Sequence, residues 1–166
     1  MKNKILHIRK IVSLLLLYVI IPSAVYILII NFVAFPIRVD GVSMYPTLKG
    51  GHIVFVSRLS SNYLEGDIVV FKANDGRYNG ELVKRIVAGP NREVIIDNEN
   101  HLVYVDGILL VEDYAVYDGE TNMGSLYFVV PNDCFFVLGD NRNHSVDSRN
   151  KEIGFVSKCD IIGKVF

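Results

Sequence analysis

The sequence predicts a mostly β protein: an N-terminal single transmembrane helix followed by one antiparallel β domain. Residues 11–37 run without a charged side chain, and about 20 apolar residues suffice to cross the hydrocarbon core of a bilayer. Beyond them, short β-branched and apolar runs alternate with Gly, Asn and Asp, which is typical of strands joined by turns. The chain of 166 residues suffices for one domain that buries a core without disulfide or metal staples.

Four cations and no acid precede the apolar run: Lys2, Lys4, Arg9 and Lys10. Lys and Arg beside a span stay on the cytoplasmic side, which places the chain from about Arg38 onward outside. We therefore expect a single-pass protein of the cell membrane with three segments: a cytoplasmic N-terminus (1–10), a transmembrane anchor (11–36) and an extracytoplasmic domain (37–166).

The alternative for the apolar segment is a secretory signal peptide that is removed. The run is much longer than the roughly 7 to 15 residues of a typical signal-peptide core, and no Ala-x-Ala-like site closes it. We therefore expect the segment to stay attached. Pro22 predicts a kink rather than a break, because membrane helices tolerate the carbonyl that a proline frees.

Charge argues against nucleic acid as a partner. The formal net charge of −1 becomes −5 once the four N-terminal cations are set aside, and no basic stripe follows. Phosphate binding needs Lys and Arg clustered on one face. We expect no nucleic acid, no metal and no cofactor.

Nine apolar and β-branched runs, too short for ordinary helices, are expected to be strands: 53–56, 67–71, 82–87, 93–96, 102–105, 108–111, 126–130, 134–138 and 161–165. Asp106 and Gly107 predict a tight hairpin turn between two of them, because both tolerate positive φ. Another reversal is expected at 98–100. After residue 37 we expect no amphipathic helix of three turns, only a short helical turn at 43–48.

The two cysteines, Cys134 and Cys159, would lie outside the cytoplasm, where a disulfide can persist. A disulfide-dependent scaffold of this length normally carries more cysteines. A Cys134–Cys159 bridge and a pair of buried, inert thiols are both compatible with the sequence.

Ser43 lies a few residues past the expected membrane exit, in the sequence GVSMYPTL. The neighbouring glycine and proline indicate an exposed, sharply turned serine, although a turn serine by itself more often caps the next element. A serine hydroxyl attacks a carbonyl only when a base removes its proton. The role of Ser43 therefore depends on a histidine or a neutral lysine elsewhere in the chain.

Lys84 is the candidate lysine, since it is embedded in the apolar run ELVKRIV. If its side chain points inward, desolvation pulls its pKa below the usual value of about 10.4. A pKa of about 7 would take roughly 4 to 5 kcal/mol from folding stability, which only a functional site justifies. The alternative is that strand alternation turns Lys84 outward as a solvated charge.

His144 is the only credible imidazole base. His7 lies on the expected cytoplasmic side, and His52 and His101 lie in polar contexts beside turns. His144 belongs to the loop GDNRNHSVDSR (139–149), whose two acids, two arginines and two serines can fix one another by charge-assisted hydrogen bonds. The alternative for this loop is a solvated surface segment.

Four motifs in order resemble those of the bacterial type I signal peptidases, in the short form typical of Gram-positive bacteria: SMYPTL (43–48), GDIVVF (66–71), Lys84-Arg85 and GDNRNHSVDSR (139–149). The resemblance extends from the span to near Phe166. It implies a membrane-anchored serine endopeptidase that removes N-terminal signal peptides from exported preproteins after small residues of the Ala-x-Ala type. It also implies an antiparallel β catalytic domain of the signal-peptidase/LexA-like β fold, which rests on the membrane surface. The implied partners are signal peptides, the lipid bilayer and the protein export machinery.

The resemblance also implies roles for single residues. Ser43 would be the nucleophile and Lys84 the general base, acting through an acyl-enzyme. Ser145 matches the serine that hydrogen-bonds the lysine. Asp147 matches an acid that supports the site, and Arg149 matches the ionic partner of that acid.

The substrate is implied to lie extended between the strand before Ser43 and the strand before Lys84. Four residues would line its shallow pockets: Val39, Asp40, Leu82 and Val83. Gly41 stands where many relatives carry a serine that helps to stabilise the oxyanion. The expected donor is therefore backbone, the Ser43 N–H first and the Gly41 N–H second. The sequence AGPNR (88–92) also departs from the family and predicts a loop of altered shape or charge.

Two other interpretations compete. A self-cleaving Ser/Lys peptidase of the repressor type shares the dyad, but the membrane span and the absence of a basic DNA-binding helix weigh against it. A non-catalytic, signal-peptidase-like chaperone in surface-fibre (pilus) assembly would require loss of the dyad, whereas Ser43 and Lys84 are both present.

Overall fold

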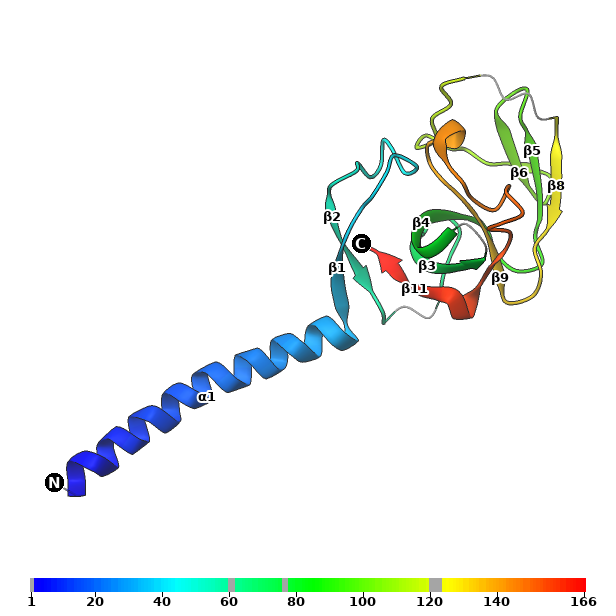
Figure 1. The fold of residues 1–166 in the computed structure, drawn as a ribbon. Coiled ribbons are helices and arrows are strands. Elements are labelled where there is room, and N and C mark those ends of the chain that lie inside the picture. Colours follow the sequence, from blue (N-terminus) through cyan, green and yellow to red (C-terminus); the bar gives the residue numbers. More distant parts are fainter. Residues whose placement is uncertain (1, 60–61, 76–77, 120–123) are drawn as a thin grey trace.

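The computed structural model describes residues 2–59, 62–75, 78–119 and 124–166. A long N-terminal helix, α1 (Lys2–Phe32), projects from a β domain (Figure 1). The helix runs unbroken through Pro22, and its stretch Leu6–Leu28 is long and apolar enough to cross a membrane. The apolar part of this stretch is not buried inside the protein, so its side chains do not pack against the β domain.

The helix ends at Phe32, before the expected end of the anchor at residue 36. Strand β1 (Ala34–Arg38) follows and pairs antiparallel with β2 (Ile53–Ser57). Pro36 explains the early end, because the residue before a proline is pushed from helical to extended conformation. β1 is the edge strand of its sheet, a position where proline is tolerated.

The β domain consists of two antiparallel sheets. The larger has the strand order β1-β2-β11-β3-β4-β9-β10, and the smaller has the order β7-β6-β5-β8. The small sheet lies at the end of the domain away from α1 (Figure 1). The remaining strands are β3 (Ile68–Asp75), β4 (Tyr78–Ala88), β5 (Glu93–Asp97), β6 (Leu102–Val105), β7 (Ile108–Leu109), β8 (Leu126–Val129), β9 (Cys134–Leu138), β10 (Val156–Ser157) and β11 (Ile161–Val165).

All nine expected runs contain a strand. β3 and β4 extend beyond the expected runs because they form one long hairpin, in which Asp75 lies opposite Tyr78. The predicted turn at Asp106 and Gly107 is confirmed, with φ of 50° and 77° between the paired strands β6 and β7. Apart from α1, the helices of the described residues are two 3₁₀ turns, η1 (Arg142–His144) and η2 (Lys158–Asp160).

Strand β9 is buried on both faces, and this fixes the loop that follows it. Phe136 and Leu138 belong to a hydrophobic cluster with residues of β4, β5 and β6, which joins the two sheets. Phe135 and Val137 point the other way, into a cluster with residues of β3, β4, β10 and β11. Successive side chains of a strand point to opposite faces, so β9 delivers the polar loop 139–149 from a rigid position.

The cysteines do not form the disulfide that the sequence allows: Cys134 and Cys159 are free. Cys134 begins β9 and packs against the cluster that joins the sheets, whereas Cys159 lies in η2 with its side chain exposed. The alternative of two buried thiols is therefore also wrong for Cys159.

Candidate active site

Ser43 lies in a tight turn between β1 and β2. Gly41 has a φ of +80° and reverses the chain just before the serine. The Tyr45 N–H donates to the Val42 carbonyl at 3.0 Å, and the Leu48 N–H donates to the Met44 carbonyl at 2.8 Å. Met44 is buried and anchors the turn in the core, which leaves the preceding serine at the rim of a cleft.

Lys84 points inward from β4, and its side chain is only 3% exposed. Its Nζ donates to the Ser43 Oγ at 2.8 Å and to the Val83 carbonyl at 3.0 Å. The sequence left a solvated, outward lysine as the alternative, and the structure excludes it. The two residues that the sequence singled out are thus in direct contact, although 41 positions separate them.

Burial lowers the pKa of Lys84 from 10.5 to about 8, against the opposing attraction of Asp147 and Asp140. A pKa of about 8 leaves roughly a tenth of the lysine neutral at pH 7. A neutral amine within 2.6 to 3.2 Å of a hydroxyl is in reach to act as its general base. The arrangement can therefore generate an alkoxide on Ser43 without a histidine.

The loop 139–149 is mostly buried, so its interpretation as a solvated surface segment is wrong. Asp147 and Arg149 form a bidentate ion pair, with Nε–Oδ1 at 2.8 Å and Nη2–Oδ2 at 2.9 Å. Asp147 Oδ2 also accepts the Gly139 N–H at 3.0 Å, and Arg149 Nη2 donates to the Arg142 carbonyl at 2.7 Å. These bonds tie the start of the loop to its end.

Two residues of this loop differ from expectation. Ser145 Oγ is buried and makes no hydrogen bond within the described residues, so the expected bond to Lys84 is absent. It lies directly against Gly139, in the space that a β-carbon there would need. His144 is exposed and bonds Asp118 at 2.9 Å, not Ser43, so the imidazole alternative is wrong.

A second buried ion pair connects three of the four motifs, and this pairing was not predicted from the sequence. Arg85 binds Asp140 through Nε–Oδ1 at 2.8 Å and Nη2–Oδ2 at 2.6 Å. Thr47 Oγ1 donates to the same carboxylate at 2.5 Å. The Ser43 turn, β4 and the loop 139–149 are therefore held together through Asp140.

Outside the motifs, Glu112 contributes a third buried ion pair. It binds the two Nη atoms of Arg142 with both carboxylate oxygens, and both side chains are almost fully buried. Tyr117 accepts a hydrogen bond from Arg142 at 2.6 Å, and Tyr114 packs against the guanidinium of Arg85. No local sequence pattern marks Glu112, which explains why it was missed.

A cleft of about 180 Å³ adjoins the Ser43–Lys84 pair. Its lining includes all four residues expected to contact substrate: Val39, Asp40, Leu82 and Val83. Within the described residues, β9 pairs with β4 only from Arg85 onward, so the part of β4 before Lys84 has a free edge on that side. An extended peptide can pair with such an edge.

Backbone donors are available at the cleft. Among the described residues, neither the Ser43 N–H nor the Gly41 N–H makes a hydrogen bond. The described residues contain no cluster of three or more His, Cys, Asp or Glu side chains that could hold a metal ion.

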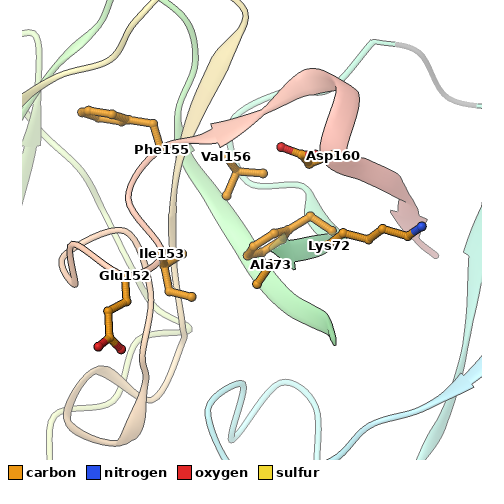
Figure 2. Close-up of a pocket in the computed structure, with 8 residues that line it drawn as sticks. Lys72, Ala73, Glu152, Ile153, Phe155, Val156 and Asp160 are labelled. Atoms are coloured by element: carbon orange, nitrogen blue, oxygen red, sulfur yellow. The ribbon is translucent and has the colours of Figure 1, made fainter. Parts of the chain in front are cut away.

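A larger cavity, of about 260 Å³, lies elsewhere in the domain (Figure 2). Its lining comes from β3, from the segment before β10, and from β10 and η2: Phe71, Lys72, Ala73, Glu152, Ile153, Phe155, Val156 and Asp160. It contains neither Ser43 nor Lys84 and is not part of the candidate active site.

Comparisons with known proteins agree with the motifs. The family described as "Signal peptidase, peptidase S26" matches residues 8–166. Signal peptidase I S of Bacillus subtilis is 36% identical over 157 residues, which are 87% of this chain and 82% of the relative. Signal peptidase I of Bacillus caldolyticus is 37% identical over 142 residues, 76% of this chain and 74% of the relative.

A solved structure agrees as well. The crystal structure of a signal peptidase I from Enterococcus faecalis superposes with a TM-score of 0.53 at 28% identity, covering 63% of this chain and 97% of that chain. The predicted resemblance and the mostly β fold class are confirmed.

Proposed function

Because this chain belongs to the signal peptidase, peptidase S26 family, we propose that Ser43 is its nucleophile and Lys84 its general base. The chain is a serine endopeptidase that removes signal peptides. The single observation that carries the assignment is the 2.8 Å hydrogen bond between the buried Lys84 Nζ and the Ser43 Oγ. The intact pair leaves the chaperone hypothesis without support.

The reaction follows from this pair. Neutral Lys84 takes the Ser43 proton as Oγ attacks the scissile carbonyl, and the negative oxygen is held by the Ser43 N–H, assisted by the Gly41 N–H. The Lys84 ammonium then protonates the leaving amine, which departs as the new N-terminus of the cut protein. Lys84, neutral again, deprotonates a water that hydrolyses the ester on Ser43 and releases the signal peptide.

The substrate adds as a strand to the free edge of β4. Val39, Asp40, Leu82 and Val83 line the cleft of about 180 Å³ beside the dyad and form shallow pockets for the side chains that precede the scissile bond. Alanine at the positions one and three before the cut fits, and larger side chains are excluded by overlap. The preferred substrates are therefore preproteins whose signal peptides end in Ala-x-Ala.

Asp147 and Arg149 support the site by holding the loop that faces Lys84. Asp147 is buried and fixes both Arg149 and the Gly139 N–H. The carboxylate also opposes the burial effect on the pKa of Lys84. Their role is to hold the geometry around Lys84 rather than to contact the reacting atoms.

The apolar stretch of α1 anchors the enzyme in the membrane, with the N-terminal residues 1–10 in the cytoplasm and the β domain on the extracytoplasmic side. Strand β1 follows α1 directly, and β2 and the chain end beside it expose three apolar side chains: Ile53, Phe55 and Phe166. These side chains face the lipid bilayer. The active site then lies near the surface where export machinery delivers preproteins.

The test is cleavage of a preprotein whose signal peptide ends in Ala-x-Ala, using the full-length protein in detergent. Ser43→Ala and Lys84→Met are each expected to abolish cleavage without lowering the unfolding temperature. Lys72→Met is the matched control, because Lys72 is exposed on the neighbouring strand β3, and it should cleave like the wild type. Cleavage retained by either dyad variant would refute the assignment.

A further inference from the structure

We propose that Asn141 is a positioning residue for the oxyanion donor, because it holds both peptide groups that flank Ser43. Its backbone N–H donates to the Ser43 carbonyl at 3.0 Å. Its side-chain Nδ2 donates to the Val42 carbonyl at 3.3 Å. The proposal rests on the proposed function and adds a role that the dyad does not supply.

Because of the geometry of the peptide bond, these contacts fix the direction of the Ser43 N–H. The Val42 carbonyl and the Ser43 N–H belong to one peptide group, and in a planar trans peptide they point in opposite directions. Asn141 binds the carbonyl from the side of the loop 139–149, so the N–H of the same group points away from that loop. This N–H donates no hydrogen bond within the described residues and is free for a substrate oxygen.

The same contact strengthens the donor. A hydrogen bond accepted by the carbonyl of a peptide group polarises that group, and chains of hydrogen bonds reinforce one another in a low-dielectric site. The Val42 carbonyl accepts from the Tyr45 N–H at 3.0 Å and from the Asn141 Nδ2 at 3.3 Å. Asn141 therefore adds to this polarisation and makes the Ser43 N–H a better donor to developing negative charge. A fixed donor also needs no reorganisation when the oxyanion forms.

Asn141 itself is held rigidly. The Val116 N–H donates to the Asp140 carbonyl at 2.8 Å and the Arg142 N–H donates to the Val116 carbonyl at 2.9 Å, so Val116 bridges the backbone around Asn141. Asp140 is in turn fixed by Arg85. Both neighbours of Asn141 in the chain are thus bonded to Val116, and Asp140 is also bonded to β4 through Arg85.

Two further observations favour a role beyond packing. Asn141 Oδ1 is buried without a hydrogen-bond partner in the described residues, and leaving a buried polar atom unpaired is unfavourable. A hydrophobic residue would avoid this, whereas only the amide supplies Nδ2 to Val42. Gly41 contributes no side-chain donor, so stabilisation of the oxyanion depends on the backbone N–H groups beside it.

The test compares Asn141→Ala with Asn143→Ala in the full-length protein. Asn143 is a matched control, since it lies in the same loop and its Nδ2 donates to the Gly119 carbonyl away from Ser43. We expect Asn141→Ala to lower kcat by about 10- to 100-fold, somewhat less than the loss of a direct oxyanion donor. KM should change by less than about twofold, and the midpoint of the pH–rate profile should stay at the wild-type value.

A pair of inhibitors distinguishes a loss of oxyanion stabilisation from a general loss of binding at the site. A peptide aldehyde adds Ser43 Oγ to its carbonyl and places the resulting oxygen at the oxyanion position, whereas the peptide amide of the same sequence forms no such bond. Asn141→Ala should weaken binding of the aldehyde by the same factor by which it lowers kcat/KM, and should leave binding of the amide unchanged. Asn143→Ala should change neither.

Several outcomes overturn the proposal: wild-type kcat in Asn141→Ala, equal losses for aldehyde and amide, or a shifted pH midpoint, which would place the effect on Lys84. If Asn141→Ala does not fold, Asn141→Ser gives the same test, because its hydroxyl is too short to replace Nδ2. Failure of both variants to fold would make the residue structural and refute the proposal. A wild-type protein that cleaves no signal peptide would instead refute the proposed function.

Discussion

The burial of Lys84 has a consequence for stability that can be measured without substrate. Its pKa falls from 10.5 to about 8, with burial as the largest cause. The unfolded chain therefore binds this proton more tightly than the folded protein does. The protonated lysine opposes folding fully below pH 8, and the penalty disappears as the pH rises from 8 to 10.5.

The magnitude follows from the pKa shift. Each unit corresponds to about 1.4 kcal/mol, so the penalty that Lys84 imposes is about 3 kcal/mol. Lys84→Met has no such proton. The free energy of unfolding of the wild type should therefore rise by about 3 kcal/mol relative to this variant between pH 7 and pH 10.5. Taking the difference between the two proteins cancels the titration of every group that they share.

The assay is urea unfolding of the full-length protein in detergent, at several values of pH across this window. Lys72→Met serves as the control: Lys72 is exposed, and its variant should follow the wild type throughout. The rate of signal-peptide cleavage by the wild type should rise with pH through a midpoint of about 8. A wild-type-to-variant difference that stays within 1 kcal/mol across the window would refute the burial argument.

Two more substitutions test the surroundings of the dyad. Gly139→Ala would place a β-carbon 2.6 Å from the Ser43 carbonyl oxygen, where ordinary contact begins at 3.4 Å. We expect kcat to fall by roughly 100-fold, the effect of a misplacement approaching 1 Å. Gly89→Ala, whose added β-carbon meets nothing within 4 Å, should retain full activity; equal activity of the two variants would contradict this reasoning. Glu112→Ala leaves the buried Arg142 guanidinium without its carboxylate partner and should lower the free energy of unfolding by about 3 to 5 kcal/mol. If urea unfolding shows that this free energy falls by less than about 1 kcal/mol, water solvates the Arg142 charge in the variant, and the argument from a buried ion pair is wrong.

Much of the site could be predicted because its signals are local. The apolar run around Lys84 and the turn residues around Ser43 are visible within a few positions, and the motifs place the pair together. Glu112 could not be found in this way, since its partner Arg142 is 30 positions away and no periodicity marks it. The prediction of a hydrogen bond between Ser145 and Lys84 was wrong, because the direction of a side chain in a packed loop depends on its neighbours.

The sequence by itself determined the apolar span, the positions of nine of the eleven strands in the described residues, and the residue types that carry the chemistry. Hydrophobic periodicity and turn residues are local properties, so these features need no knowledge of the fold. Only the tertiary structure decided that Lys84 points inward, that Asp140 joins three motifs and that Asn141 holds the peptides beside Ser43. Burial and hydrogen-bond direction depend on which distant segments pack together, here β4, the Ser43 turn and the loop after β9.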